Sequence, residues 1–192
     1  DASNKCYFGA SYAYTLLEDV SGVDSGTSFT GGYEDGFSLA GAFGCGLKDS
    51  EHIRAEIELG YTSTGYDFIS GLGVTADVTG DIDVLSGTVG GYFDLPVTDT
   101  IKPYVGGGIG VIGYDIGATT VTLGSTQVTT SGANDSALTT FAEIGLGIGL
   151  SNTIVVAPNI RYSWFNTGDC GAGCTIDDDS AWLYKMTVRI GF

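Results

Sequence analysis

The segment Trp182-Leu183-Tyr184-Lys185-Met186-Thr187-Val188-Arg189-Ile190-Gly191-Phe192 alternates between two kinds of side chain. The even-numbered residues are aromatic or apolar, and the odd-numbered ones, except Leu183, are charged, hydroxylic or glycine. Alternation with a period of two indicates a β-strand that has one apolar and one polar face. An apolar band with an aromatic residue at each end is typical of a strand that crosses a lipid bilayer. The segment therefore predicts a membrane-spanning strand.

The composition of the whole chain agrees with a β-barrel rather than a helical membrane protein. The chain has 192 residues, and we expect them to form a single domain, 1–192. No apolar run approaches the roughly 18 residues that a spanning helix requires. Glycine is frequent, at 32 residues, whereas proline is rare, at 3. Glycine without proline suits strands whose inward face must stay small.

The charge of the chain is strongly acidic, with 7 basic and 23 acidic residues. A basic footprint is missing, which argues against nucleic acid as a partner and leaves cations as candidates. The four cysteines fit an oxidising compartment such as the bacterial periplasm or cell surface. The first residues, 1–4, are typical of a mature chain whose signal peptide has been removed.

Strand signals recur along the chain. They predict eight strands, at about 6–15, 37–47, 53–62, 82–95, 101–114, 137–150, 154–165 and 181–192. Each is close to the roughly 9–11 residues of a tilted membrane crossing. The connections are alternately short and long: 48–51, 96–100 and 151–153 are turns, whereas 16–36, 63–81, 115–136 and 166–180 are long.

This asymmetry predicts an all-β fold, an antiparallel up-and-down transmembrane barrel with short periplasmic turns and four long extracellular loops. Two of the long connections, at 74–79 and 119–130, are rich in β-forming residues. We expect hairpins there that project beyond the membrane, the second one centred on Gly124-Ser125.

Three segments resemble one family of proteins. Lys102-Pro103-Tyr104-Val105-Gly106-Gly107-Gly108-Ile109-Gly110-Val111 looks like the fifth strand of the small eight-stranded outer membrane β-barrels, the opacity-type porin-like surface proteins related to the outer membrane protein A barrel. Ile160-Arg161-Tyr162 and the last strand, which ends in Phe192, fit the same pattern. The resemblance implies a place in the bacterial outer membrane, and recognition of Phe192 by the barrel-assembly machinery. Members of the family are variously adhesins, surface antigens, narrow channels or envelope tethers.

Charged residues inside the strands share the polar face. The predicted lumen network consists of Arg54, Glu56, Glu58, Glu143, Arg161, Lys185 and Arg189. Turn lengths place Glu143 opposite Arg161 and Asp94 opposite Lys102, within a slip of two residues. Charges buried in the lumen should be paired, since an isolated buried charge is costly. An eight-stranded barrel is just wide enough for side chains, so we expect a plugged lumen. A gate or a narrow ion path is the alternative.

The cysteines predict disulfides at two places. Cys6 and Cys45 lie on adjacent strands at the same rim, and Cys170 and Cys174 lie within one loop. Four cysteines allow three connectivities, of which we favour 6–45 with 170–174.

Other candidate sites are weaker. The acidic loops, including Asp177-Asp178-Asp179, predict a solvated outer surface, or one that binds divalent cations and bridges them to lipopolysaccharide. No catalytic, cofactor or metal motif appears. His52, the single histidine, falls at the periplasmic rim, away from any outer-leaflet chemistry.

The function predicted from the sequence is a non-enzymatic outer membrane barrel with a charge-plugged lumen, which serves envelope structure and surface interaction. The alternatives are a narrow, cation-preferring channel and an enzyme that modifies envelope lipid. The expected partners are outer membrane lipids, lipopolysaccharide and the barrel-assembly machinery, and association of identical chains stays open.

Overall fold

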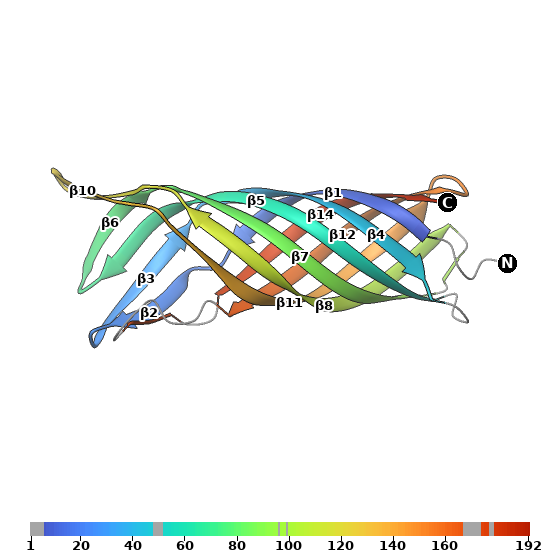
Figure 1. Cartoon of the computed structure of the whole chain (residues 1–192), viewed down its shortest axis with the longest axis horizontal. Coiled ribbons are helices and arrows are strands. Elements are labelled where there is room, and N and C mark those ends of the chain that lie inside the picture. The colour runs from blue at the N-terminus through green and yellow to red at the C-terminus, as the bar shows by residue number, and fades with distance from the viewer. Residues whose placement is uncertain (1–5, 48–51, 96, 99, 167–173, 177–178) are drawn as a thin grey trace.

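A computed structural model describes residues 6–47, 52–95, 97–98, 100–166, 174–176 and 179–192. Eight long antiparallel strands form a closed ring (Figure 1), in which each strand pairs with its neighbours along the chain and the last pairs with the first. They are β1 (Cys6–Leu17), β4 (Gly36–Gly46), β5 (Ile53–Gly71), β7 (Asp81–Asp94), β8 (Ile101–Ile116), β11 (Ala133–Gly149), β12 (Ile154–Asn166) and β14 (Asp179–Gly191). The predicted eight-stranded up-and-down barrel is therefore confirmed.

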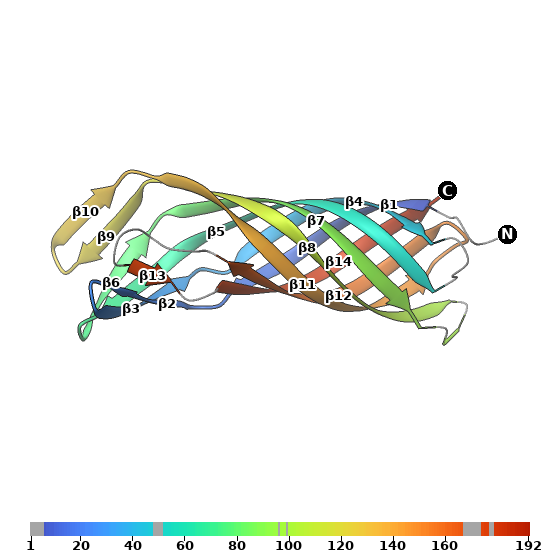
Figure 2. The same ribbon diagram turned by 60° about the horizontal axis from the view of Figure 1, so that its bottom comes forward.

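Six further strands lengthen the wall at the end that carries the long connections (Figure 2). They are β2 (Val20–Asp24), β3 (Thr27–Tyr33), β6 (Val74–Thr79), β9 (Thr119–Leu123), β10 (Thr126–Thr130) and β13 (Cys174–Ile176). β6 pairs with β5, and β9 and β10 form a hairpin. Gly124, at a positive φ of 61°, lies in the turn of that hairpin, so the predicted projecting hairpins are confirmed.

The hairpin of β2 and β3 was not predicted, and β5 is longer than predicted. The sequence pattern predicted an end near Thr62, whereas the strand continues to Gly71. Beyond the barrel ring, β5 pairs with β3 on one side and with β6 on the other. The segment 20–33 is rich in glycine, serine and threonine and has no continuous apolar face, so its strands depend on this pairing rather than on a hydrophobic pattern.

The two faces of the barrel wall differ as a transmembrane barrel requires. Outward-facing Leu59 is 75% exposed and Ile144 is 59% exposed, whereas inward-facing Glu143, next in sequence to Ile144, is 4% exposed. A soluble β-sandwich would bury the apolar side chains instead. Among the described residues, no helix has the length and hydropathy that a membrane crossing requires.

Aromatic side chains border the apolar outer face at both ends. At the short-turn end, the ring of Phe192 lies 5.3 Å from that of Phe8 and 6.4 Å from that of Phe43. At the long-loop end, Tyr162 contacts Trp164 and Trp182, with ring centroids 4.6 and 4.5 Å apart. Aromatic girdles of this kind mark the two interfaces of a bilayer.

Candidate functional site in the barrel lumen

The charged side chains of the lumen come from alternate positions of four strands. On β5, the buried residues Arg54, Glu56 and Glu58 share the inner face, because successive side chains of a strand point to opposite sides. β11 contributes Glu143, and β12 contributes Arg161, which lies directly opposite Glu143 in the register, as the turn length predicts. β14 contributes Lys185 and Arg189.

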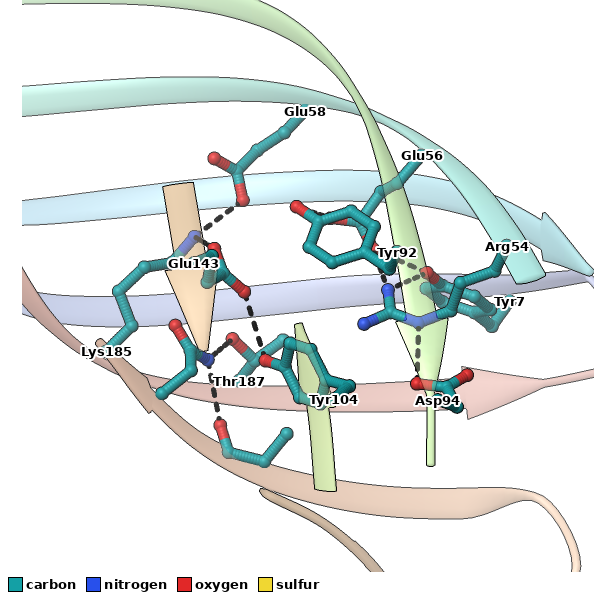
Figure 3. A network of polar contacts seen from close by, with 12 residues as sticks. Tyr7, Arg54, Glu56, Glu58, Tyr92, Asp94, Tyr104, Glu143, Lys185 and Thr187 are labelled. Atoms are coloured by element: carbon teal, nitrogen blue, oxygen red, sulfur yellow. Dashed lines mark hydrogen bonds and ion pairs between the residues drawn. The ribbon is translucent and has the colours of Figure 1, made fainter. Parts of the chain in front are cut away.

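Four of these residues form a neutral quartet across the middle of the barrel. Arg161 donates from Nη1 to Glu58 at 2.5 Å and from Nε to Glu143 at 2.8 Å. Lys185 Nζ lies 2.8 Å from Glu58 and 3.7 Å from Glu143 (Figure 3). Two carboxylates therefore balance two cations, and each charge has an opposite charge as a partner, which offsets the cost of removing it from water.

A second group lies nearer the short-turn end. Arg54 Nη1 donates to the Tyr7 hydroxyl at 2.8 Å and lies 3.3 Å from Glu56, while its Nε lies 3.3 Å from Asp94. Tyr7 in turn donates to Glu56 at 2.5 Å. Tyr92 connects the two groups, since its hydroxyl accepts from Arg161 at 3.3 Å and donates to Glu56 at 3.4 Å. Figure 3 shows the rings of Tyr7, Tyr92 and Tyr104 among these charges.

Glycines on the inner face make room for these tyrosines. A Cβ atom at Gly106 would lie 2.1 Å from the ring of Tyr92, and one at Gly145 would lie 2.4 Å from the ring of Tyr104. At Gly44, a Cβ atom would lie 2.4 Å from the ring of Tyr7. No side chain larger than glycine fits at these positions without movement of the ring. The high glycine content of the chain thus allows tyrosines to cross the lumen.

Two details of the network differ from the pairing first expected. Asp94 lies opposite Tyr104 and not Lys102, a shift of two residues that the prediction allowed. Arg189 makes no ion pair within the described part of the chain. Its guanidinium lies over the ring of Tyr104, 4.7 Å from the centroid, and Arg54 lies at the same distance from that ring. The aromatic face takes the place of the predicted carboxylate.

Above the quartet, on the long-loop side, the lumen contains a cavity of about 380 Å³. Glu58, Arg161 and Lys185 line its inner end. Its walls are formed by aliphatic and aromatic side chains together with serine and threonine hydroxyls, among them Ile82, Ile112, Phe141, Thr15, Ser38 and Ser163. It extends to Tyr33, Tyr66 and Asp179 and to the exposed Asp135. The sequence pattern did not predict this cavity.

Asp179 lines the cavity and is buried, so the prediction of a solvated acidic run is wrong for this residue; Asp177 and Asp178 lie outside the described residues. Asp179 opens β14, three residues before Trp182, and shares the inward parity of Leu183 and Lys185. Its carboxylate accepts from the Tyr33 hydroxyl at 3.2 Å and from the Ser180 amide at 2.7 Å. Burial raises the pKa of Asp179 to about 6. Its parity with Lys185 was the signal in the sequence that could have located it.

Other acids at the long-loop end hydrogen-bond to outward-facing aromatic residues. Glu18 accepts from Ser180, Trp182 and Tyr162, at 2.5, 3.1 and 3.1 Å. These hydrogen bonds, that of Ser180 foremost, lower the pKa of Glu18. The Tyr14 hydroxyl donates to Asp35, and that of Tyr61 donates to Asp83 at 2.7 Å. Among the described residues, no group of three or more His, Cys, Asp or Glu side chains could hold a metal ion.

The remaining predicted positions lie at the short-turn end. Cys6 and Cys45 form a disulfide, as predicted. Cys170 of the predicted second pair lies outside the described residues, so the 170–174 disulfide stays a prediction. His52 stacks edge-on against Phe93, with centroids 6.1 Å apart. The Phe192 amide donates to the carbonyl of Cys6 at 3.0 Å.

Comparison with solved structures places the fold among known proteins. OprG, an outer membrane protein of Pseudomonas aeruginosa, is 14% identical with a TM-score of 0.64, and the match covers 100% of this chain and 97% of that one. The chain has the fold of the small outer membrane β-barrels. The Neisserial surface protein NspA is 16% identical with a TM-score of 0.58, covering 97% of each chain. OmpT, an outer membrane protease of Escherichia coli, is 8% identical with a TM-score of 0.58, covering 100% of this chain and 97% of that one.

At these identities the likeness concerns the fold and not the activity. No protein-family model matches the chain, and no curated protein is significantly similar to it in sequence. Function is therefore inferred from the residues of the lumen.

Proposed function

We propose that this chain is a non-enzymatic protein of the bacterial outer membrane whose lumen is closed by the charged quartet. The ion pair between Arg161 of β12 and Glu58 of β5, at 2.5 Å, carries the proposal. In the ring of eight strands, β5 and β12 are four strands apart and therefore face each other across the barrel. A bond between opposite walls leaves no room for a continuous water column at that level.

Planar-bilayer conductance of the refolded protein tests the closure. We expect the wild type to be silent. The double variant Glu58→Ala/Arg161→Ala should open, because it removes one charge of each sign and leaves Lys185 paired with Glu143 at 3.7 Å. Asp83→Asn, which changes an acid on the outer face, serves as the control and should stay silent. Steady openings of the wild type would instead establish the alternative, a narrow channel.

The acidic long-loop end supports surface interaction as the role of the closed barrel. Glu18, Asp35 and Asp83 lie at the outer border of the apolar band, bonded to aromatic residues. Divalent cations would bridge such carboxylates to the phosphates of lipopolysaccharide. Flotation with lipopolysaccharide vesicles should depend on Mg²⁺ and weaken in the triple variant Glu18→Gln/Asp35→Asn/Asp83→Asn. Equal flotation with EDTA would count against this role.

Two further parts of the proposal concern the short-turn end. His52 packs against Phe93, and the described residues include no nucleophile bonded to it, so we assign no catalytic role. Any lipid-modifying activity of the purified protein that disappears in His52→Ala would reverse this assignment. Phe192 is proposed as the residue that the barrel-assembly machinery recognises. Its deletion should lower the yield of folded protein in cells, while refolding in detergent is retained.

A further inference from the structure

The cavity above the quartet has the properties of a binding site for a small molecule. Its volume of about 380 Å³ falls within the usual range for ligand pockets, roughly 300–1,000 Å³. Its walls are largely apolar, with Ile82, Ile112 and Phe141 among the most buried side chains of the barrel. Ile82 and Ile112 face the lumen and belong neither to the charged network nor to the lipid-facing surface, whereas Phe141 also packs under the Arg161 guanidinium, which lies 4.1 Å from the ring centroid. Walls of this kind suit an occupant with an apolar body.

One carboxylate at the far end of this cavity lacks a counter-ion. Of the four buried acids in the described part of the chain, Glu56, Glu58 and Glu143 are ion-paired, and Asp179 is not. Asp179 is 7% exposed and lines the cavity. Its described bonds come from a neutral hydroxyl and a backbone amide. An unpaired buried carboxylate costs free energy that a ligand cation would offset.

Tyrosine rings surround the same end of the cavity. Tyr33 and Tyr66 stack with centroids 5.5 Å apart, and both line the cavity together with Tyr114. Tyr33 also donates its hydroxyl to Asp179 at 3.2 Å. Tyrosine faces beside a carboxylate form a favourable site for an ammonium group, through cation–π attraction.

We propose that the outer half of the lumen binds an organic ammonium ion with an apolar body. The ammonium group lies against Asp179 and the tyrosines, and the body lies against Ile82, Ile112 and Phe141. The cations at the inner end, Arg161 and Lys185, are already paired with Glu58 and Glu143, so they offer no free charge to an anion. Asp135 at the rim and the net charge of −16 add to the preference for a cation.

The dimensions of the cavity limit the ligand. Asp179 and Lys185 are six residues apart on β14, which corresponds to about 20 Å along the strand. The quartet forms the inner end, so a ligand enters and leaves on the long-loop side if the barrel is closed. This proposal concerns binding and not conduction, and binding is measured independently of bilayer current.

Three isosteric probes test the charge preference: phenethylammonium, 2-phenylethanol and phenylacetate. The protein is refolded in detergent with ¹³C-labelled isoleucine methyl groups. Ile82 and Ile112 report on the cavity, whereas Ile144 and Ile160 on the lipid-facing surface report on partition of the probe into the micelle. We expect phenethylammonium to shift the Ile82 and Ile112 signals saturably, at an affinity at least about tenfold above that of the alcohol, and phenylacetate to bind weakest.

Two variants separate charge from shape. Asp179→Asn should reduce the affinity for phenethylammonium to that of the alcohol, whereas Asp77→Asn, an equal change of charge at an exposed acid outside the cavity, should leave it unchanged. Ile112→Trp keeps the carboxylate and fills the cavity, and it should abolish binding of all three probes. Heat-modifiable gel migration shows that each variant is folded. Equal affinity for ammonium and alcohol, equal effects of the two Asp variants, or shifts of Ile144 and Ile160 alone would overturn the proposal.

Discussion

The two halves of the lumen are filled differently, although the same eight strands enclose both. The half near the short-turn end is filled with ion pairs, stacked guanidinium groups and tyrosines, and a disulfide joins β1 to β4 at its rim. The half near the long-loop end holds a cavity with aliphatic and aromatic walls, and Asp179 at its far end is the buried acid without an ion pair among the described residues. Side chains of both signs meet across the lumen in the first half. The cavity lies in the second half, where Asp179 has no opposite charge beside it among the described residues, and there we propose that a ligand binds.

Removal of one quartet acid should lower the free energy of unfolding more than any other change in either half of the lumen. Glu143→Gln leaves Arg161 and Lys185 to share Glu58, so one buried cation loses its counter-charge. We expect a loss of about 3–5 kcal/mol in the free energy of unfolding. The urea midpoint of the folded band on cold gels measures it. Asp83→Asn is the matched control, and a shift no larger than that of the control would show that the quartet does not stabilise the barrel.

Removal of the disulfide in the short-turn half should cause the next largest loss of stability. Cys6 and Cys45 are separated by 39 residues in sequence, and a bridge over such a loop stabilises by about 2–4 kcal/mol. Cys6→Ser/Cys45→Ser should lower the urea midpoint accordingly. Reductant should lower the midpoint of the wild type to that of the double variant and leave the variant unchanged. A midpoint unaffected by reductant in both proteins would contradict this expectation.

Overpacking around the tyrosines should cause a smaller loss of stability. Gly106→Val would drive a Cβ atom into the ring of Tyr92, and overpacking of this kind costs about 1–3 kcal/mol. Gly91 faces outward, and a Cβ atom there would meet no other atom within 4 Å, so Gly91→Val is the matched control. We expect only the first variant to lower the urea midpoint. Equal midpoints would mean that Tyr92 moves aside at little cost.

The effect in the cavity half depends on pH, and near pH 4 it is the smallest of these changes in stability. Burial raises the pKa of Asp179 from 3.8 to about 6, so the folded state favours the neutral acid. The stability that this residue contributes is complete below about pH 4 and is lost as the pH rises through about 6. Asp179→Asn should therefore be more stable than the wild type by up to about 3 kcal/mol at pH 8, and nearly equal to it at pH 4.

The groups that face Asp179 are Tyr33 and Tyr66, which stay neutral in this range, and the carboxylate of Glu18. Glu18→Gln is the control for its influence. It should shift the transition slightly downward and not remove it. A stability difference between Asp179→Asn and the wild type that does not change with pH would contradict the assignment.

Much of the lumen could be predicted from the sequence because two simple rules determine it. Strand periodicity placed the charges of β5, β12 and β14 on the inner face, and the short turn after Gly149 placed Glu143 opposite Arg161. For Asp94 the same reasoning was off by two residues, which is the slip it allowed, and the partner is Tyr104 rather than Lys102. The conformation of each turn sets the register of the two strands that it joins, and the composition of the turn does not reveal that conformation.

The sequence by itself determined the eight strands, the apolar outer face and the polar inner face, because alternation with a period of two is a local property of each strand. Only the tertiary structure decided which charges meet. Glu58 and Arg161 are 103 residues apart, and their contact depends on closure of the ring. Closure also buries Asp179 beside Tyr33, 146 residues away, and leaves the cavity beneath it. Contacts across a barrel depend on strand register and on the size of every inward side chain together, and no single segment encodes these.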